Sequence, residues 1–118
     1  MTSSRHIIIA EDEELVAIAL ACMLESHGFR VTVTRNGQEA LEAEAQDPAD
    51  ILLTDMRMPV LGGRELIQRI RQRRPDLPVV VMTGFSESIP AEEPGRTLVL
   101  NKPFQVDVLF NALQAVGP

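Results

Sequence analysis

The chain has 118 residues, enough for one domain with a single hydrophobic core but not for two. Seventeen acidic and eleven basic residues give a net charge of −6, which argues against general binding of nucleic acid or of an anionic membrane. A hydrophobic content of 45% excludes a disordered acidic tail, and one cysteine excludes an internal disulfide. The N-terminus carries no recognisable targeting signal and no run long enough to span a membrane, so a cytoplasmic location is expected.

Short apolar runs recur along the chain and predict five β-strands. They are His6–Ala10, Phe29–Thr34, Ile51–Thr54, Val79–Met82 and Leu98–Leu100. The second run alternates apolar and polar residues, as an edge strand with one exposed side does. The third and fourth are continuously apolar, which is typical of strands covered on both faces.

Segments with helical spacing of apolar residues lie between and after these runs. They are Glu13–His27, Gly37–Gln46, Gly63–Arg73 and Gln105–Val116. Asn36 is a suitable N-cap for the second helix because its side chain can accept a hydrogen bond from the first turn. Cys22 falls among the apolar residues of the first helix, and we expect it to lie in the core as an inert thiol.

The segment Ser86–Arg96 interrupts this alternation of strands and helices. It contains Pro90, Pro94 and Gly95 and has almost no apolar stripe. Because proline removes a backbone donor and clashes with the preceding turn, at most one helical turn is expected there. The whole pattern predicts an α/β fold: a doubly wound, five-stranded parallel sheet with helices on both faces and a fourth helix that is short or absent.

Residues able to do chemistry follow four of the five predicted strands. Glu11 and Asp12 follow the first, Asp55 the third, Thr83 the fourth and Lys102 the fifth. Ligands of open parallel sheets bind at the carboxyl ends of the strands, near the point where the strand order reverses. With the order 2-1-3-4-5, strands one and three are neighbours and three carboxylates converge. Their mutual repulsion would be relieved by protonation or by a divalent cation, and oxygen ligands of this kind suit Mg²⁺.

This set of groups is suited to phosphoryl transfer. Asp55 can attack phosphorus and form an acyl phosphate. A metal ion, with Lys102 on the far side of the cleft, would neutralise charge on the phosphoryl oxygens, and the hydroxyl of Thr83 would donate a hydrogen bond to one of them.

The residues that carry this chemistry resemble those of the response-regulator receiver domain of two-component signalling. The resemblance covers essentially the whole chain, so residues 1–118 are expected to form a single receiver domain, either as a stand-alone regulator or as a part of a hybrid sensor histidine kinase. Four motifs in order, each closing its own strand, make the resemblance specific: Ala10-Glu11-Asp12-Glu13, Leu53-Thr54-Asp55-Met56-Arg57-Met58-Pro59, Val81-Met82-Thr83-Gly84 and Asn101-Lys102-Pro103-Phe104.

The resemblance implies a flavodoxin-like fold and a place in a histidine–aspartate phosphorelay. Asp55 would accept a phosphoryl group from a phosphohistidine on a sensor histidine kinase or a histidine phosphotransfer protein, with Thr83 and Lys102 contacting the phosphoryl oxygens. The domain would catalyse its own phosphorylation and dephosphorylation, and the phosphorylated state would alter its interaction with a partner. A weak homodimer is left open.

The resemblance also implies the ligands of the metal. Asp12, Asp55 and the backbone carbonyl of Arg57 would hold Mg²⁺ directly, and Glu11 would reach it through water. Glu11 stands where the family more often has aspartate, which moves a carboxylate outward by one methylene group and should only adjust the metal affinity.

Two further departures from the family pattern concern how a signal leaves the domain. Val99 occupies the position, three residues before Lys102, where the family usually has Tyr or Phe. The segment Ser86–Arg96 replaces a helix that is part of the output face in many relatives. These departures suggest that the signal leaves by another face, or that the domain is a phosphate relay or sink.

Other functions are compatible with parts of the sequence. One alternative is a non-phosphorylated, receiver-like interaction module whose acidic pocket is a relic or a structural metal site. A flavin-binding domain of the same fold is disfavoured because Glu11 and Asp12 would repel its phosphate. An aspartate-nucleophile phosphatase of another family would require a second aspartate where Arg57 stands. The complete set of acidic pair, acceptor, hydroxyl and lysine favours the phosphoacceptor.

Overall fold

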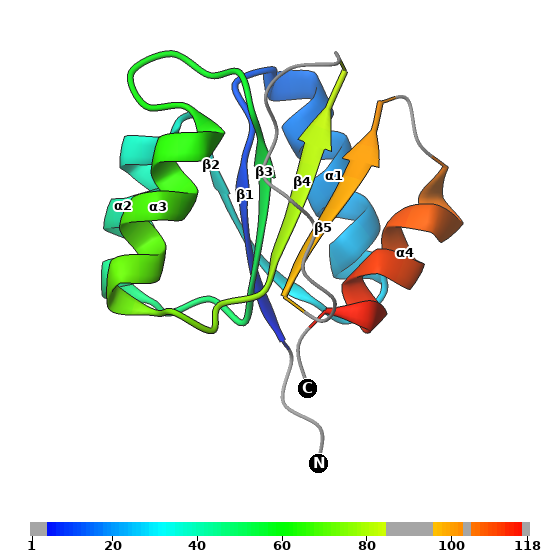
Figure 1. Ribbon diagram of the computed structural model, residues 1–118. Coiled ribbons are helices and arrows are strands. Elements are labelled where there is room, and N and C mark those ends of the chain that lie inside the picture. The colour runs from blue at the N-terminus through cyan, green and yellow to red at the C-terminus, as the bar shows by residue number, and fades with distance from the viewer. Residues whose placement is uncertain (1–4, 85–95, 103–104, 117–118) are drawn as a thin grey trace.

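A computed structural model describes residues 5–84, 96–102 and 105–116 of the chain (Figure 1). The segment expected to hold a short or absent helix, Ser86–Arg96, therefore lies outside the described residues except for Arg96. Pro103 and Phe104, the end of the fourth motif, also lie outside them.

The described strands form one parallel sheet in the order β2-β1-β3-β4-β5. The strands are β1 (His6–Ala10), β2 (Arg30–Thr34), β3 (Ile51–Asp55), β4 (Val79–Thr83) and β5 (Thr97–Asn101). Both the strand order and the parallel pairing confirm the prediction. The third and fourth strands are each one residue longer than predicted, so Asp55 and Thr83 are the last residues of their strands rather than the first of their loops.

Four helices among the described residues cover the two faces of this sheet. They are α1 (Glu14–Ser26), α2 (Gly37–Gln46), α3 (Gly63–Arg73) and α4 (Val106–Ala115). Figure 1 shows α2 and α3 on one face and α1 and α4 on the other. None of the helices among the described residues is long and apolar enough to cross a lipid bilayer.

Alternation along the central strands divides the core into two clusters, one for each face of the sheet. Ile7 and Ile9 of β1 pack in the cluster that includes Leu24 and Leu109, from α1 and α4. Ile8, between them in sequence, packs in the cluster that includes Leu66 from α3. Every residue of β1, β3 and β4 is buried, whereas β2 is mixed, as predicted for an edge strand.

The cap of α2 also follows the sequence prediction. The Asn36 side chain accepts a hydrogen bond of 2.9 Å from the backbone N–H of Glu39. The Glu39 carboxylate in turn accepts one of 2.9 Å from the N–H of Arg35. This reciprocal pair fixes where α2 begins.

The predicted place of Cys22 is wrong. Its side chain is exposed, whereas the buried stripe of α1 consists of Ala17, Leu20 and Leu24. Cys22 lies two residues from both Leu20 and Leu24, and two residues turn a helix by about 200°, which places the thiol on the opposite side.

Two leucines of α1 offer a matched test of this packing. Leu24 is fully buried, whereas Leu15 is 82% exposed. Leu24→Ala is expected to lower the free energy of unfolding by about 3 kcal/mol, because it leaves a cavity in the core. Leu15→Ala should change it by less than about 0.5 kcal/mol. Urea denaturation followed by circular dichroism measures both values, and equal losses would contradict the assignment of the buried face.

Candidate functional site

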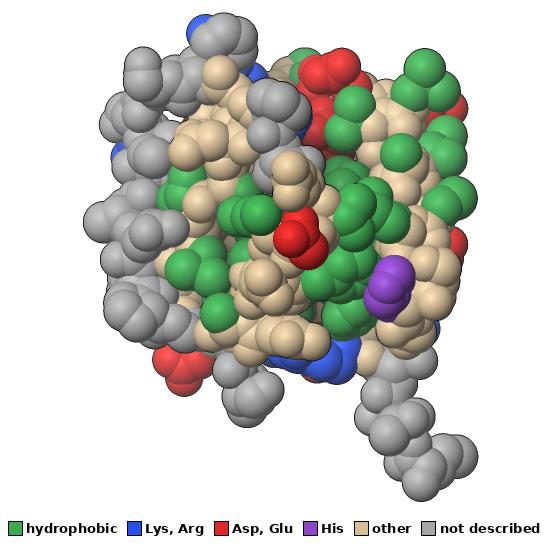
Figure 2. Space-filling view, turned by 90° about the vertical axis from the view of Figure 1, so that its right-hand side faces the viewer, with side chains coloured by type: hydrophobic (Ala, Val, Ile, Leu, Met, Phe, Trp, Pro, Cys, Tyr) green, Lys and Arg blue, Asp and Glu red, His purple; other side chains and the backbone are tan. Residues whose placement is uncertain are grey.

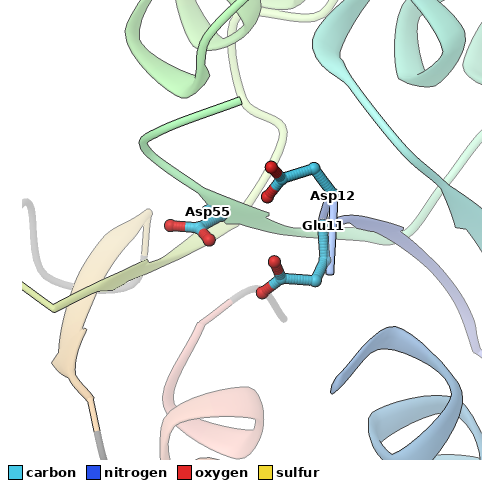
Figure 3. A group of neighbouring side chains, drawn as sticks. All are labelled: Glu11, Asp12 and Asp55. Carbon is cyan, nitrogen blue, oxygen red and sulfur yellow. The ribbon is translucent and has the colours of Figure 1, made fainter. Parts of the chain in front are cut away.

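Three carboxylates meet at the carboxyl ends of β1 and β3. Glu11 and Asp12 follow β1, and Asp55 ends β3; the two strands pair directly, with Ala10 opposite Thr54. One oxygen from each carboxylate lies within 4.8 Å of the others, and Figure 3 shows the three groups turned toward a shared space. The predicted convergence is therefore present in the structure.

The three carboxylates differ in their exposure to water. Glu11 is completely buried, Asp55 is 8% exposed, and Asp12 is exposed. The N–H of Glu13 donates to Glu11 Oε2 at 3.1 Å, and the N–H of Met56 donates to Asp55 Oδ1 at 2.8 Å. Each of these backbone donors fixes one oxygen and leaves the other directed to a different partner.

That other partner is Lys102. Its Nζ donates to Glu11 Oε1 at 3.0 Å and to Asp55 Oδ2 at 2.9 Å, so one ammonium bridges two buried carboxylates. The backbone N–H of Lys102 donates to the carbonyl of Thr83 at 2.7 Å, which ties the end of β5 to the end of β4. The sequence placed Lys102 across the cleft from the acidic groups, whereas the structure places it between them.

Burial and charge act on the pKa values in opposite directions. Burial raises the pKa of the Glu11 carboxyl above its ordinary value, and the hydrogen bonds from Glu13 and Lys102 offset this only in part. Burial lowers the pKa of the Lys102 ammonium, but its hydrogen bonds to Asp55 and Glu11 outweigh that effect and the pKa is raised. The raised pKa means that the Lys102 side chain retains its proton and its positive charge.

A cavity of about 250 Å³ opens beside these groups. It is lined by Asp12, Glu13, Asp55, Met56, Arg57, Thr83, Gly84 and Lys102. The site thus brings together Asp12, Asp55, Thr83 and Lys102 and includes Arg57, all five expected from the sequence, while Glu11 lies behind them, fully buried. The available donors are carboxylate oxygens, which suit a hard cation such as Mg²⁺.

Two features of the site were not predicted from the sequence. One is the pair of backbone donors, from Glu13 and Met56, for which the sequence carries no signal because every residue but proline has an N–H. The other is an apolar groove of about 600 Å³ beside the site. It is lined by Leu15, Val16, Ala19, Leu20, Met23, Met82, Lys102, Val106 and Leu109. The sequence does indicate this groove, because α1 has more apolar residues than a single buried stripe requires.

The family model described as the response regulator receiver domain matches residues 7–114. The chain belongs to this family. Receiver domains typically bind Mg²⁺ at an acidic cluster, and this receiver domain has an acidic cluster of Glu11, Asp12 and Asp55. Receiver domains also interact with histidine kinases or phosphotransfer proteins.

Comparison with individual proteins supports the same assignment. The receiver domain is 36% identical over 114 residues to YkoG, an uncharacterized transcriptional regulatory protein of Bacillus subtilis, covering 93% of this chain but 50% of YkoG. It is 34% identical over 113 residues to the response regulator receiver protein CpdR of Brucella abortus, covering 93% of this chain and 94% of CpdR. The chain thus spans about half of one relative and nearly all of the other.

A solved structure shares the fold. The chemotaxis response regulator CheY4 of Vibrio cholerae superposes with a TM-score of 0.82, covering 94% of this chain and 97% of CheY4 at 24% identity. The similarity in shape at this low identity reflects the common arrangement of strands and helices.

The bridge made by Lys102 yields a stability prediction. Lys102→Met leaves two buried carboxylates without their cation. We expect it to lower the free energy of unfolding by about 2 kcal/mol. This loss is smaller than for a fully buried ion pair because Lys102 is partly exposed. Arg35→Met, which alters an exposed arginine 3.8 Å from Glu14, should have little effect. Chemical denaturation in EDTA compares the two variants.

The same variant should respond to pH. A carboxyl with a raised pKa in the folded state stabilises the fold when protonated and loses that contribution as the pH rises, and without Lys102 the pKa of Glu11 should rise further. The difference in stability between Lys102→Met and the wild type is therefore expected to narrow as the pH falls from about 7 to about 5. A difference that widens would show that Lys102 does not neutralise Glu11.

Proposed function

We propose that this receiver domain is a phosphoacceptor and that Asp55 is the residue phosphorylated. The observation that carries the proposal is the position of Asp55: it lines an open cavity, beside two further carboxylates, the buried Thr83 and the ammonium of Lys102. An oxygen of Asp55 would attack the phosphorus of a phosphohistidine. The O–P bond forms as the P–N bond breaks, and the imidazole leaves with the electron pair.

The ligand set for Mg²⁺ implied by the family resemblance is supported by the same cavity, which Asp12, Asp55 and Arg57 line. Asp12, Asp55 and the backbone carbonyl of Arg57 would hold the ion, which supplies positive charge next to the phosphoryl oxygens when bound. Both oxygens of Glu11 already accept hydrogen bonds, from Lys102 and from the N–H of Glu13. Each oxygen keeps a second lone pair, and Glu11 is fully buried and does not line the cavity, so it would reach the ion through a metal-bound water rather than as a direct ligand.

Lys102 and Thr83 would stabilise the charge on the transferred group. The Lys102 ammonium is 2.9 Å from Asp55 Oδ2, so it needs only a small shift to donate to a phosphoryl oxygen attached to Asp55. Thr83 ends β4 and lines the cavity, and its hydroxyl is a suitable donor to a second oxygen. Donors fixed in advance around the reacting group lower the barrier more than mobile donors do.

We further propose that the phosphodonor docks in the groove between α1 and α4. Figure 2 shows apolar side chains gathered along this face. Leu15 is 82% exposed and Val106 is 45% exposed, and Lys102 lines both the groove and the site cavity. An apolar helix of a sensor histidine kinase or phosphotransfer protein seated there would bring its phosphohistidine to the mouth of the cavity.

The wider role of the protein is part of the same proposal. We infer that it works in the cytoplasm, within a histidine–aspartate phosphorelay, and that phosphorylation changes its interaction with a partner. It would act alone, as the nearly complete match to CpdR suggests, or as one part of a larger protein, as the half-length match to YkoG suggests.

Phosphorylation of Asp55 is testable by intact mass. Incubation with acetyl phosphate and Mg²⁺ should add one phosphoryl group to the wild type, and Asp55→Asn or EDTA should abolish the addition. Thr83→Ala should slow the reaction by about 10-fold to 100-fold because one donor to the phosphoryl group is lost, and Thr83→Ser should restore most of the rate. No addition at saturating donor would favour the alternative, a receiver-like interaction module that is not phosphorylated.

The docking groove is testable with two matched valines. Val106 in the groove is 45% exposed, and Val33 on β2 is 42% exposed. Val106→Ala should slow phosphoryl transfer from a phosphorylated kinase or phosphotransfer protein several-fold, and Val33→Ala should not. Both variants should react with acetyl phosphate at the wild-type rate, since this small donor needs no docking surface. Equal transfer rates for the two variants would contradict docking in the groove.

A further inference from the structure

The loop between β3 and α3, residues 56–62, directly follows the phosphoacceptor and carries the carbonyl of Arg57. Near its end, Leu61 is buried, with 5% of its surface exposed. The backbone N–H of Gly37, the first residue of α2, donates to the carbonyl of Leu61 at 2.9 Å. A helix that contributes no side chain to the site is therefore joined to the loop beside it.

The contact between Gly37 and Leu61 leaves no room for a side chain. A Cβ at position 37 would lie 2.6 Å from the carbonyl oxygen of Leu61 and 3.0 Å from its Cβ. Gly37 is not among the described residues with a positive φ, so close approach, rather than backbone conformation, is what requires glycine here. The backbone of α2 and that of the loop are therefore in direct contact at this point.

The end of the loop that meets α3 is held in the same way. The N–H of Gly63 donates to the carbonyl of Met56 at 3.1 Å, and a Cβ at position 63 would lie 2.3 Å from the carbonyl oxygen of Asp55. The loop is thus fixed to α3 beside the phosphoacceptor and to α2 at Leu61. Arg57 lies between these two points.

Between them the backbone is strained. Val60 has a φ of +69°, a conformation that a β-branched residue rarely adopts, and its side chain is 80% exposed. The N–H of Leu61 donates to the carbonyl of Pro59 at 2.7 Å across this residue, which closes a tight turn. Strain of this kind persists only where surrounding contacts determine the conformation. Because the side chain of Val60 is exposed, the contacts that hold this conformation come from the rest of the loop.

We propose that Gly37 and Leu61 are positioning residues, whose contact holds the loop so that the backbone carbonyl of Arg57 faces the carboxylates of Asp12 and Asp55. The proposal rests on the proposed function in one respect, that Mg²⁺ occupies the site. By thermodynamic reciprocity, a contact that favours metal binding is itself strengthened when the metal binds. The position of α2 and the affinity for Mg²⁺ are therefore linked.

Gly37→Ala tests the contact. We expect roughly tenfold weaker binding of Mg²⁺ because the new methyl group displaces the loop. Gly28→Ala is the control: Gly28 lies just after α1 with a φ of +91°, and an added Cβ would meet nothing within 4 Å. That variant should lose stability through backbone strain while binding Mg²⁺ as the wild type does. Calorimetric titration with MgCl₂ measures the affinity, and thermal unfolding in EDTA measures the stability.

Asn36→Ala provides a second variant in case Gly37→Ala does not fold. It removes the side chain that caps α2 and leaves the packing of Gly37 sterically unchanged. A smaller loss of Mg²⁺ affinity is expected, again absent from Gly28→Ala. If the α2 variant that folds binds Mg²⁺ as tightly as Gly28→Ala does, the positioning role is overturned.

Acetyl phosphate separates this inference from the proposed function. Weaker Mg²⁺ binding in Gly37→Ala, with no phosphoryl group added to the wild type, would support positioning and overturn the phosphoacceptor. Phosphorylation of the wild type with unchanged Mg²⁺ affinity in Gly37→Ala would overturn positioning alone. A wild type that does not bind Mg²⁺ would overturn both.

Discussion

The repulsion between carboxylates at the ends of two adjacent parallel strands is the constraint on which the rest of the site depends. Two negative charges 4–5 Å apart repel by about 3–4 kcal/mol at the effective dielectric constant of a protein surface. Glu11 and Asp55 accept this proximity because Lys102 donates to both. The strand order brings the carboxylates close together, and the buried strands stabilise the fold against their repulsion. Lys102, which follows β5, provides the positive charge. Lys102 offsets one of the three negative charges of Glu11, Asp12 and Asp55, and the remaining negative charge favours binding of a divalent cation.

The features predicted correctly from the sequence are those set by local patterns and one general rule. Continuous apolar runs identified β3 and β4, and alternation identified β2 as the edge strand. The rule that ligands bind at the carboxyl ends of parallel strands then placed Asp55, Thr83 and Lys102 at one edge of the sheet, because each stands where an apolar run stops, and the structure brings all three to one cavity. The family resemblance added the backbone carbonyl of Arg57, which no side-chain pattern could single out, and its role as a metal ligand stays a prediction.

The features that were missed depend on distances between segments remote in sequence. Cys22 lies among apolar residues, but the turn of the helix, and not composition, decides which face is buried. The bridge from Lys102 to Glu11 joins residues 91 positions apart, which follow β5 and β1, two strands that are not neighbours in the sheet. The approach of Gly37 to Leu61 likewise has no local signature, since a glycine after an N-cap asparagine looks like an ordinary helix start.

Val99 and α2 together bear on how a change at the site could reach the surface. The family resemblance places a large aromatic ring at Val99, whereas the valine is only partly buried, against the core cluster on the α2–α3 side of the sheet. A valine side chain has few rotamers and no aromatic ring that could reorient. A movement of Thr83 would therefore cause little change in the side chain at position 99. The loop after Asp55 has a tighter connection, because its backbone touches that of α2 with no side chain between them. Displacements pass through such rigid contacts with less loss than through flexible side chains, so α2 and α3, which both hold this loop, are better connected to the site than Val99 is.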